Sequence, residues 1–231
     1  MRSFQPFDFA NGLLEEFRND GFKTSLWAWD KAHLSLPAIG THFGFVQDGK
    51  ATLVCDSGEF TLKAGIYFSV PGACTITGEA RGIAITSAAY NGFFQVGGPI
   101  EKAGRLKYID GCTDSLLISP IMKGDPCLNL LYFPSGIKQT QHTHPSNRVG
   151  VVARGTGKCI TPEGAIPLFP GQIFLIRANG LHSFETSSSD MTVIAYHPDS
   201  DFGASHENHP MINRTMVDGI SASQLVEIRT K

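Results

Sequence analysis

The feature that most constrains the fold of this chain is an internal repeat. When the first half is shifted by 106 residues, it lies on the second half without a gap, and four glycines coincide. The matched pairs are Gly44 with Gly150, Gly49 with Gly155, Gly58 with Gly164 and Gly65 with Gly171. A glycine at a fixed place marks a turn or a close approach of backbones. Four coincidences therefore indicate two copies of one structural unit.

Short apolar runs separated by turn residues predict that each copy is built from β-strands. We expect strands at residues 26–29, 43–46, 51–55, 59–62 and 66–70 in the first half, and at 128–133, 149–153 and 191–197 in the second. Asp48-Gly49 is typical of a hairpin turn. Helix signals are few. Residues 13–17 predict a short helix that Gly21 ends, and residues 221–228 predict a second at the C-terminus.

Three histidines in the second copy are candidate metal ligands. His142 and His144 are two residues apart in a β-compatible run, so on an extended strand they share one face. His182 supplies a third nitrogen further along. Neutral imidazole suits zinc, copper, iron and nickel. The alternative is three histidines that are simply hydrogen-bonded or exposed. In the repeat alignment the first copy has Leu36, Ala38 and Ile76 at these positions, which cannot hold a metal.

The spacing of Gly136, His142, His144 and Gly155 resembles the first sequence motif of the cupin superfamily. Gly171 and His182 fit part of the second motif, whose usual proline-x-glycine is replaced at residues 177–179. Arg148 occupies the place of the motif's glutamate. The resemblance implies an all-β chain of two tandem cupin-type antiparallel β-barrels, or jelly rolls, with few short helices and a metal in one barrel.

This bicupin reading divides the chain into four parts. Residues 1–90 are expected to form a degenerate N-terminal barrel without metal ligands, and residues 91–104 a linker. Residues 105–200 would form the metal-binding barrel, and residues 201–231 a tail that packs on a barrel. His206 and His209 in the tail do not form a zinc-binding HExxH helix, because their spacing is wrong and Pro210 disfavours helix at His209.

Arg148 suggests the chemistry of the ligand. Three neutral histidines leave the full charge of a divalent ion, and a guanidinium at ~6 Å adds repulsion of about 5 kcal/mol at an effective dielectric near 20. An anionic substrate that ligates the metal and pairs with Arg148 would relieve this repulsion. The alternative is that Arg148 turns to solvent or pairs with an acidic residue of the first barrel or of a dimer mate.

Tyr132, Tyr196 and His197 lie on strands that can face the interior of the second barrel. Each is a candidate acid–base group or a hydrogen-bond donor to the metal's ligands. For the two tyrosines, the alternative is an aromatic ring that fills the barrel with its hydroxyl satisfied.

The resemblance to cupins with three histidines implies an iron(II)-type dioxygenase acting on a small carboxylate or diketone. Nickel, zinc, manganese or copper are the other candidate ions. The alternatives are a non-oxidative isomerase, lyase or decarboxylase of a sugar acid or keto acid, and a binding protein without turnover. We also expect a homodimer.

Composition limits the partners and the compartment. A net charge of −2 gives no reason to expect nucleic-acid binding, and no apolar stretch is long enough to span a membrane. Five scattered cysteines and the lack of an apolar N-terminal region predict reduced thiols in the cytoplasm.

Overall fold

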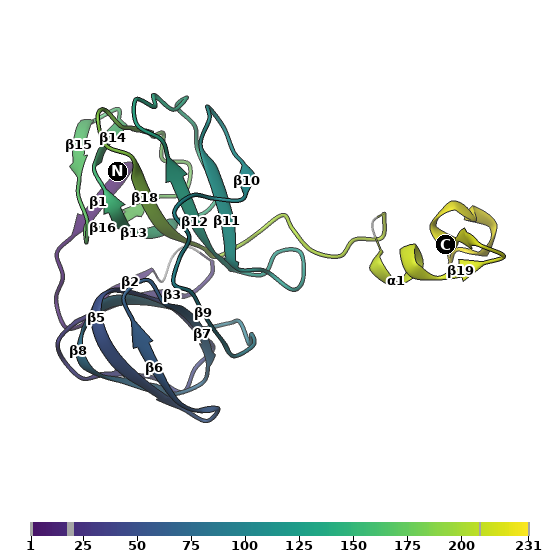
Figure 1. The fold of residues 1–231 in the computed structure, drawn as a ribbon, viewed down its shortest axis with the longest axis horizontal. Coiled ribbons are helices and arrows are strands. Elements are labelled where there is room, and N and C mark those ends of the chain that lie inside the picture. The colour runs from purple at the N-terminus through teal and green to yellow at the C-terminus, as the bar shows by residue number, and fades with distance from the viewer. Residues whose placement is uncertain (1, 18–20, 208, 231) are drawn as a thin grey trace.

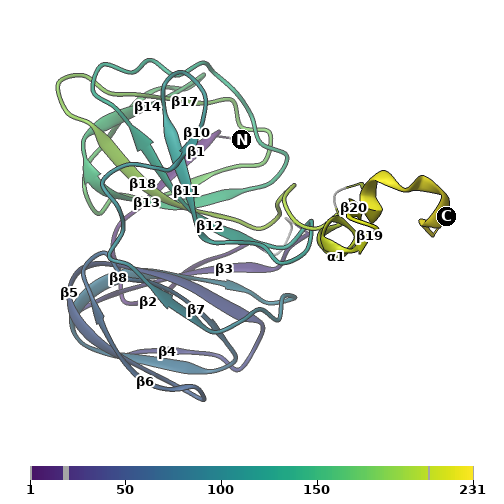
Figure 2. The ribbon, with the colours of Figure 1, turned by 45° about the vertical axis from the view of Figure 1, so that its right-hand side comes forward.

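The computed structural model describes residues 2–17, 21–207 and 209–230. Two β-barrels lie one against the other, and a small C-terminal unit extends to one side of them (Figure 1, Figure 2). The prediction of an all-β chain with two tandem antiparallel barrels is confirmed. None of the helices in the described residues is long and apolar enough to cross a membrane.

The N-terminal barrel is built on one antiparallel sheet with the strand order β2-β3-β8-β5-β7-β9; β4 pairs with β8 and β6 with β5. Its strands are β2 (Gly12–Phe17), β3 (Thr24–Asp30), β4 (Leu34–Leu36), β5 (Thr41–Cys55), β6 (Gly58–Lys63), β7 (Tyr67–Pro71), β8 (Cys74–Ser87) and β9 (Gln95–Gly97).

The C-terminal barrel has a seven-stranded sheet facing a three-stranded one. The larger sheet contains, in order, β1 (Phe4–Phe7), β16 (Ile173–Ile176), β13 (Arg148–Gly155), β18 (Met191–His197), β12 (Cys127–Phe133), β11 (Thr113–Ile118) and β10 (Leu106–Lys107). The smaller contains β15 (Gly164–Leu168), β14 (Gly157–Thr161) and β17 (Ser183–Glu185). Beyond them lie α1 (Pro210–Arg214), β19 (Met216–Val217), β20 (Ile220–Ser221), η1 (Ala222–Gln224) and η2 (Val226–Ile228).

The N-terminal barrel is not the continuous segment 1–90 that was predicted, because β1 belongs to the sheet of the C-terminal barrel and β9 to that of the N-terminal barrel. β1 precedes the N-terminal barrel but pairs with β16 of the other one, with Phe4 opposite Ile176. β9 lies in the predicted linker, yet it pairs with β7 of the N-terminal barrel. In the repeat, β7 and β16 are equivalent strands. Each barrel is therefore completed at the same edge by the segment that leads into the other barrel.

The repeat is visible in the packing around equivalent glycines. Gly44 is the strand partner of Phe68, and Gly150 is the strand partner of Phe174. A methyl group added to Gly44 would lie 2.0 Å from the Phe68 ring, and one added to Gly150 would lie 2.7 Å from the Phe174 ring. Each phenylalanine ring thus packs directly on the backbone of its partner glycine, where a larger side chain would clash, and this explains the glycine at both positions.

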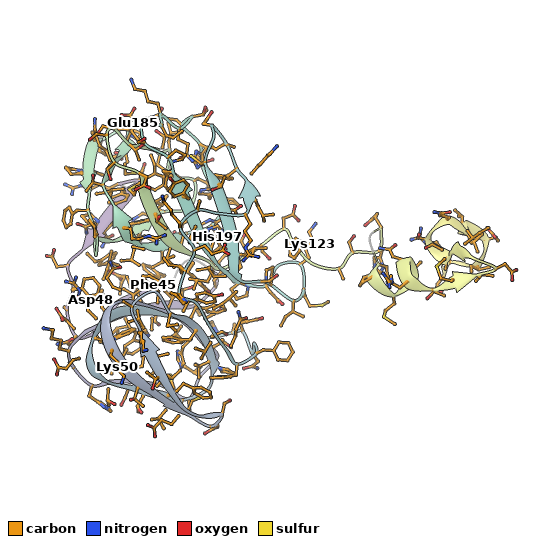
Figure 3. The ribbon with its side chains drawn as sticks, viewed as in Figure 1. Phe45, Asp48, Lys50, Lys123, Glu185 and His197 are labelled. Atoms are coloured by element: carbon orange, nitrogen blue, oxygen red, sulfur yellow. The ribbon has the colours of Figure 1, made fainter. Side chains whose placement is uncertain are left out.

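The largest apolar cluster lies between the barrels, where the two main sheets pack face to face. Val149 and Val151 of β13 point into this cluster, together with Phe43 and Phe45 of β5. Figure 3 shows Phe45 at the junction of the barrels. Because side chains alternate along a strand, the neighbouring Arg148 points into the C-terminal barrel. The N-terminal barrel's own interior is filled with apolar side chains, including Leu36 and Ile76.

Three local predictions were wrong. Residues 13–17 form β2 rather than a helix, because pairing with β3 buries Phe17, whereas a five-residue helix is too short to be stable. Asp48-Gly49 is not a hairpin turn: β5 continues through it, with a shift of register on β8 between Val46 and Asp48. At the C-terminus, residues 221–228 form two 3-10 turns instead of one helix.

We predict that Gly155→Ala destabilises the protein by about 3 kcal/mol, because the new methyl group would meet the Asp190 carbonyl oxygen at 1.9 Å on a backbone with φ of +70°. Gly136→Ala is the matched control, since its φ of +77° is similar and nothing lies within 4 Å. It should cost about 1 kcal/mol. Urea unfolding measures both, and equal losses would contradict the role given to the close contact.

Candidate metal centre

The three predicted histidines come together in the C-terminal barrel. His142 and His182 face each other across an isolated antiparallel bridge, with N···O distances of 2.9 and 3.0 Å. His144 follows two residues later, on the same side. One ligand nitrogen from each histidine lies within 4.8 Å of the others. This spacing allows the three rings to hold a metal ion.

Backbone carbonyls fix the orientation of two of these rings. His142 Nδ1 lies 2.8 Å from the Thr140 oxygen, and His182 Nδ1 lies 2.8 Å from the Gly180 oxygen. Each Nδ1 therefore carries the proton and donates it, which leaves Nε2 with a free lone pair. His182 Nε2 is buried and has no hydrogen-bond partner among the described residues. A buried, unpartnered acceptor is costly, and a metal ion would satisfy it.

The surroundings keep His144 and His182 neutral. Burial, the charge of Arg148 and the other two histidines lower the pKa of His144 to about 3. Burial is also the main cause that lowers the pKa of His182 to about 4. Metal binding requires neutral imidazole. Both rings are therefore ready to bind a cation at neutral pH without first losing a proton.

Arg148 lies beside the histidines and not in solvent. Its residue is 9% exposed, and Nη1 contacts Asp199 Oδ1 at 3.2 Å as well as the hydroxyl of Ser146. The ion pair is made with Asp199, which follows β18 in the same barrel, and not with the first barrel. Arg148 Nε is buried and unpartnered among the described residues. Burial lowers the pKa of the guanidinium, and Asp199 opposes that shift.

The histidines and Arg148 line one pocket between the two sheets of the barrel, with a volume of about 70 Å³. His197 also lines it, and its ring centre lies 6.4 Å from that of His144. Burial, followed by the charges of Arg148 and His144, lowers the pKa of His197 well below its usual value. The remaining wall is mostly apolar: Leu131, Phe133, Phe174, Ile176, Phe184, Val193 and Ala195.

Sequence reasoning missed four polar residues of this pocket, which are Tyr108, Asp114, Asn129 and Gln139. Asn129 Nδ2 lies 3.5 Å from Asp114 Oδ2, and Asn129 Oδ1 is buried without a partner among the described residues. Burial raises the pKa of the Asp114 carboxyl, while the contact with Asn129 lowers it. Asp114 lies on β11, a strand that the sequence pattern did not predict. The alternation of Asn129 with apolar neighbours on residues 128–133 was the available signal for its inward position.

Two of the predicted residues lie away from the pocket. Tyr196 is fully buried in the cluster between the barrels, where its ring centre is 5.2 Å from that of Phe43. Tyr132 packs against the same cluster, and its hydroxyl donates to Asp190 Oδ2 at 3.2 Å. Both stand on the outer face of their strands, so we do not assign them to the site. Of these strand residues, His197 alone lines the pocket.

His206 and His209 do not join the metal cluster. His209 is the N-cap of α1, where its side chain accepts from the Ile212 N–H. The unit that follows extends away from both barrels (Figure 1). The predicted packing of the tail on a barrel holds for its first residues, since Asp201 pairs with Lys123 and Ala204 bridges to Met122, but not for the unit that follows.

Comparison with known proteins shows which proteins share this architecture. A family model of the AraC-like ligand-binding domain matches residues 135–211, which include all three histidines. No curated protein matches the sequence. The structure is similar to a cupin 2 conserved barrel domain protein from Leptotrichia buccalis (TM-score 0.59, 13% identity, 85% of this chain and 88% of that one).

Two further solved structures cover most of the chain. Protein Ylba from E. coli gives a TM-score of 0.58 at 15% identity over 86% of this chain and 92% of that one. Salicylate 1,2-dioxygenase from Pseudaminobacter salicylatoxidans gives 0.56 at 11% identity over 76% and 70%. At these identities the likeness is one of fold. The chain has the two-barrel cupin fold, with a three-histidine cluster in its second barrel.

We predict that the His182→Ala variant loses most of the metal bound by the purified protein, because it removes one of three ligands and the buried Nε2. His33→Ala is the matched control, since His33 lies on the other barrel and contacts Ser35. Elemental analysis after reconstitution with iron(II), nickel, zinc and manganese measures both. Equal metal content in the two variants would show that the ion binds elsewhere.

We also predict that the metal-free protein becomes less stable as the pH falls below about 6.5. His144 and His182 have folded-state pKa values of about 3 and about 4, so the unfolded chain binds more protons in this window. The full stability is present above pH 6.5 and is lost progressively toward pH 4. Urea unfolding from pH 7.5 to 4.5 measures the slope, and His144→Gln should flatten it. An unchanged slope in that variant would contradict the assignment.

Proposed function

We propose that this protein is a metal-dependent enzyme of the dioxygenase type that acts on a small anionic substrate. The observation that carries the proposal is that three histidines and a buried arginine open into the same pocket. Iron(II) is the ion we expect, with nickel, zinc, manganese or copper as alternatives. When bound, such an ion supplies Lewis acidity and, in the case of iron, redox chemistry.

The charge balance of the site favours an anion. Asp199 offsets one unit of positive charge on Arg148, but no carboxylate belongs to the histidine cluster. A bound divalent ion would therefore leave uncompensated positive charge in a partly desolvated pocket. Arg148 Nε–H is a buried donor without a partner among the described residues, so it can donate to an incoming oxygen. A carboxylate or enolate can interact with the cation and with this donor at once, which orients the substrate.

The size of the pocket limits the substrate. The centre of a water-sized sphere can reach about 70 Å³ of the pocket, and about 10–15 Å³ of such space holds one water molecule, so an ion and a small ligand fit together. Short keto acids, hydroxy acids and diketones are therefore the first compounds to screen. Salicylate 1,2-dioxygenase, which shares the fold, has been solved as an adduct with gentisate. Salicylate and gentisate therefore belong in a substrate screen beside the shorter acids.

Asp114 and Asn129 add two polar side chains to the otherwise mostly apolar wall of the pocket. The raised pKa of the Asp114 carboxyl suits a group that accepts a proton from a substrate hydroxyl or from a carbon next to a carbonyl, then returns it. Asn129 Oδ1 can accept a hydrogen bond from the same substrate. This pair also favours the second candidate function, a non-oxidative isomerase, lyase or decarboxylase of a sugar acid or keto acid.

A third candidate is a small-molecule-binding protein without turnover, which the match to the AraC-like ligand-binding domain supports. Oxygen consumption that needs both iron(II) and an acid substrate supports the dioxygenase. Turnover without oxygen, with nickel, zinc or manganese, supports the second candidate. Tight binding with no product under either condition supports the third.

The five cysteines are free thiols, four of them buried. Together with the absence of any disulfide among the described residues, this supports our proposal of a reducing compartment, the cytoplasm.

We predict that Arg148→Met weakens the binding of an anionic substrate by at least tenfold, because it removes a buried charge-assisted hydrogen bond worth about 1.5–3 kcal/mol. The variant also leaves Asp199 unpaired, so Arg148→Met with Asp199→Asn is tested alongside it. Arg154→Met is the control, since Arg154 is exposed and bonds to residues outside the pocket. Calorimetric titration of the metal-loaded proteins gives the dissociation constants. Unchanged affinity in both Arg148 variants would remove its substrate role.

We predict that Asp114→Asn lowers turnover by about 100-fold or more while metal content stays the same, because the amide cannot accept a proton. Asp110→Asn, on the loop before β11, serves as the control for the loss of a carboxylate nearby. A normal turnover number in the Asp114 variant would leave proton transfer to another group, His197 being the next candidate.

A further inference from the structure

We propose that the C-terminal unit, residues 209–230, is an exchange arm that packs on a second copy of this chain. We call this unit the arm. Figures 1 and 2 show it apart from both barrels at the end of an extended connection. Its structure is held by contacts of its own, such as Ala222 N–H to the Thr215 oxygen at 2.8 Å and the β19–β20 pair.

The arm exposes most of its apolar side chains. Among its described residues Ala222 alone is buried. Six large apolar residues are exposed by 40–71%: Met211, Met216, Val217, Ile220, Val226 and Ile228. A unit this small cannot build a sufficient core alone, and an apolar surface of this kind marks an interaction site. We therefore infer that another surface covers the exposed apolar side chains of the arm.

A matching surface lies on the barrel at the root of the arm. Ile121, Met122 and Phe202 are exposed by 44%, 59% and 58%, and we call them the root patch. The root itself is fixed: Lys123 pairs with Asp201 at 2.7 Å, and Gly124 N–H bonds to the Ser200 oxygen. Figure 3 labels Lys123 where the connection leaves the barrel. The connection thus starts from a base that is tied to the barrel, and the root patch beside it stays exposed.

The charges favour a protein partner over a membrane or nucleic acid. Residues 209–230 contain Arg214 and Arg229 against Asp218 and Glu227, so the formal charges cancel. An apolar surface without net charge suits another neutral apolar surface, whereas phosphate-bearing partners require an excess of cations. The root patch has this character.

The area available argues for a second copy in particular. A large aliphatic side chain contributes on the order of 100 Å² of apolar surface, so six at half exposure give roughly 300 Å² per arm. One arm on an unrelated partner would bury about 600 Å² in total, which is typical of weak contacts. Two arms exchanged between copies bury about 1,200 Å², which reaches the range of stable interfaces. In such a two-fold dimer, each arm covers the partner's root patch.

The experiment compares the full-length protein with Val226→Asp/Ile228→Asp by sedimentation equilibrium. We expect the wild type to have twice the 25.0 kDa mass of one chain, and the arm variant to dissociate with a constant at least 100-fold higher. The matched control is Val54→Asp/Ile39→Asp, two similarly exposed residues of the N-terminal barrel, which should remain dimeric. Circular dichroism and metal content check that the barrels stay folded.

A second measurement tests the exchange itself. Val226→Cys and Phe202→Cys are made as separate proteins, mixed and treated with a short thiol crosslinker. We expect a crosslinked peptide that joins position 226 of one chain to position 202 of the other, because that contact exists only between chains. A monomeric wild type at 100 μM, a dimer that survives the arm substitutions, or a dimer without this crosslink would each overturn the proposal. A monomer that binds neutral phosphatidylcholine vesicles would assign the arm to a lipid surface instead.

Discussion

Packing of the two main sheets against each other is the interaction on which the rest of the structure depends. It buries Phe43 and Phe45 of one barrel against Val149, Val151 and Tyr196 of the other. Because strand residues alternate between faces, this packing decides which residues look into the C-terminal barrel. As a result, Arg148 of β13 and His197 of β18 point into the C-terminal barrel. Tyr196 points the other way and packs in the cluster between the barrels. The contents of the metal pocket are thus a consequence of the contact between barrels.

The pocket places buried neutral imidazoles, which can bind a cation, beside a buried guanidinium, which can bind an anion. Burial holds His144 and His182 neutral, and among the described residues the buried Arg148 guanidinium pairs with one carboxylate, that of Asp199. Unpartnered buried atoms on His182, Arg148 and Asn129 lie around the same space. Each is costly alone, and a cation together with an anion would satisfy all three. The site is better understood as a receptor for an ion pair than for either ion separately.

Much of this could be predicted from the sequence, because the repeat and the His-x-His spacing are local patterns. The four glycine pairs predicted that the two barrels are equivalent, and the alignment of the copies placed the three histidines in the second one. The alignment does not hold to the end: Gly44 pairs with Ala84, whereas Gly150 pairs with Ala195, five residues further along. Asp114 lies on a strand without a strong pattern, and its place in the pocket depends on pairing with Leu131. The faces of residues 128–133 and 191–197 depend on tertiary packing that a nearly continuous apolar run does not encode.

The pairing of β1 with the C-terminal barrel has a consequence for how such a chain can change during evolution. A duplicated domain normally keeps the option of separating again, because each copy folds by itself. Here β1, which precedes the N-terminal barrel in the chain, covers the β16 edge of the C-terminal barrel, so a break after β9 would leave β16 as a bare edge open to aggregation. The N-terminal barrel has no ligand histidines at the equivalent positions and holds no predicted metal site, yet it cannot be discarded. It persists as a folding partner, and mutations in it reach the pocket through stability rather than through chemistry.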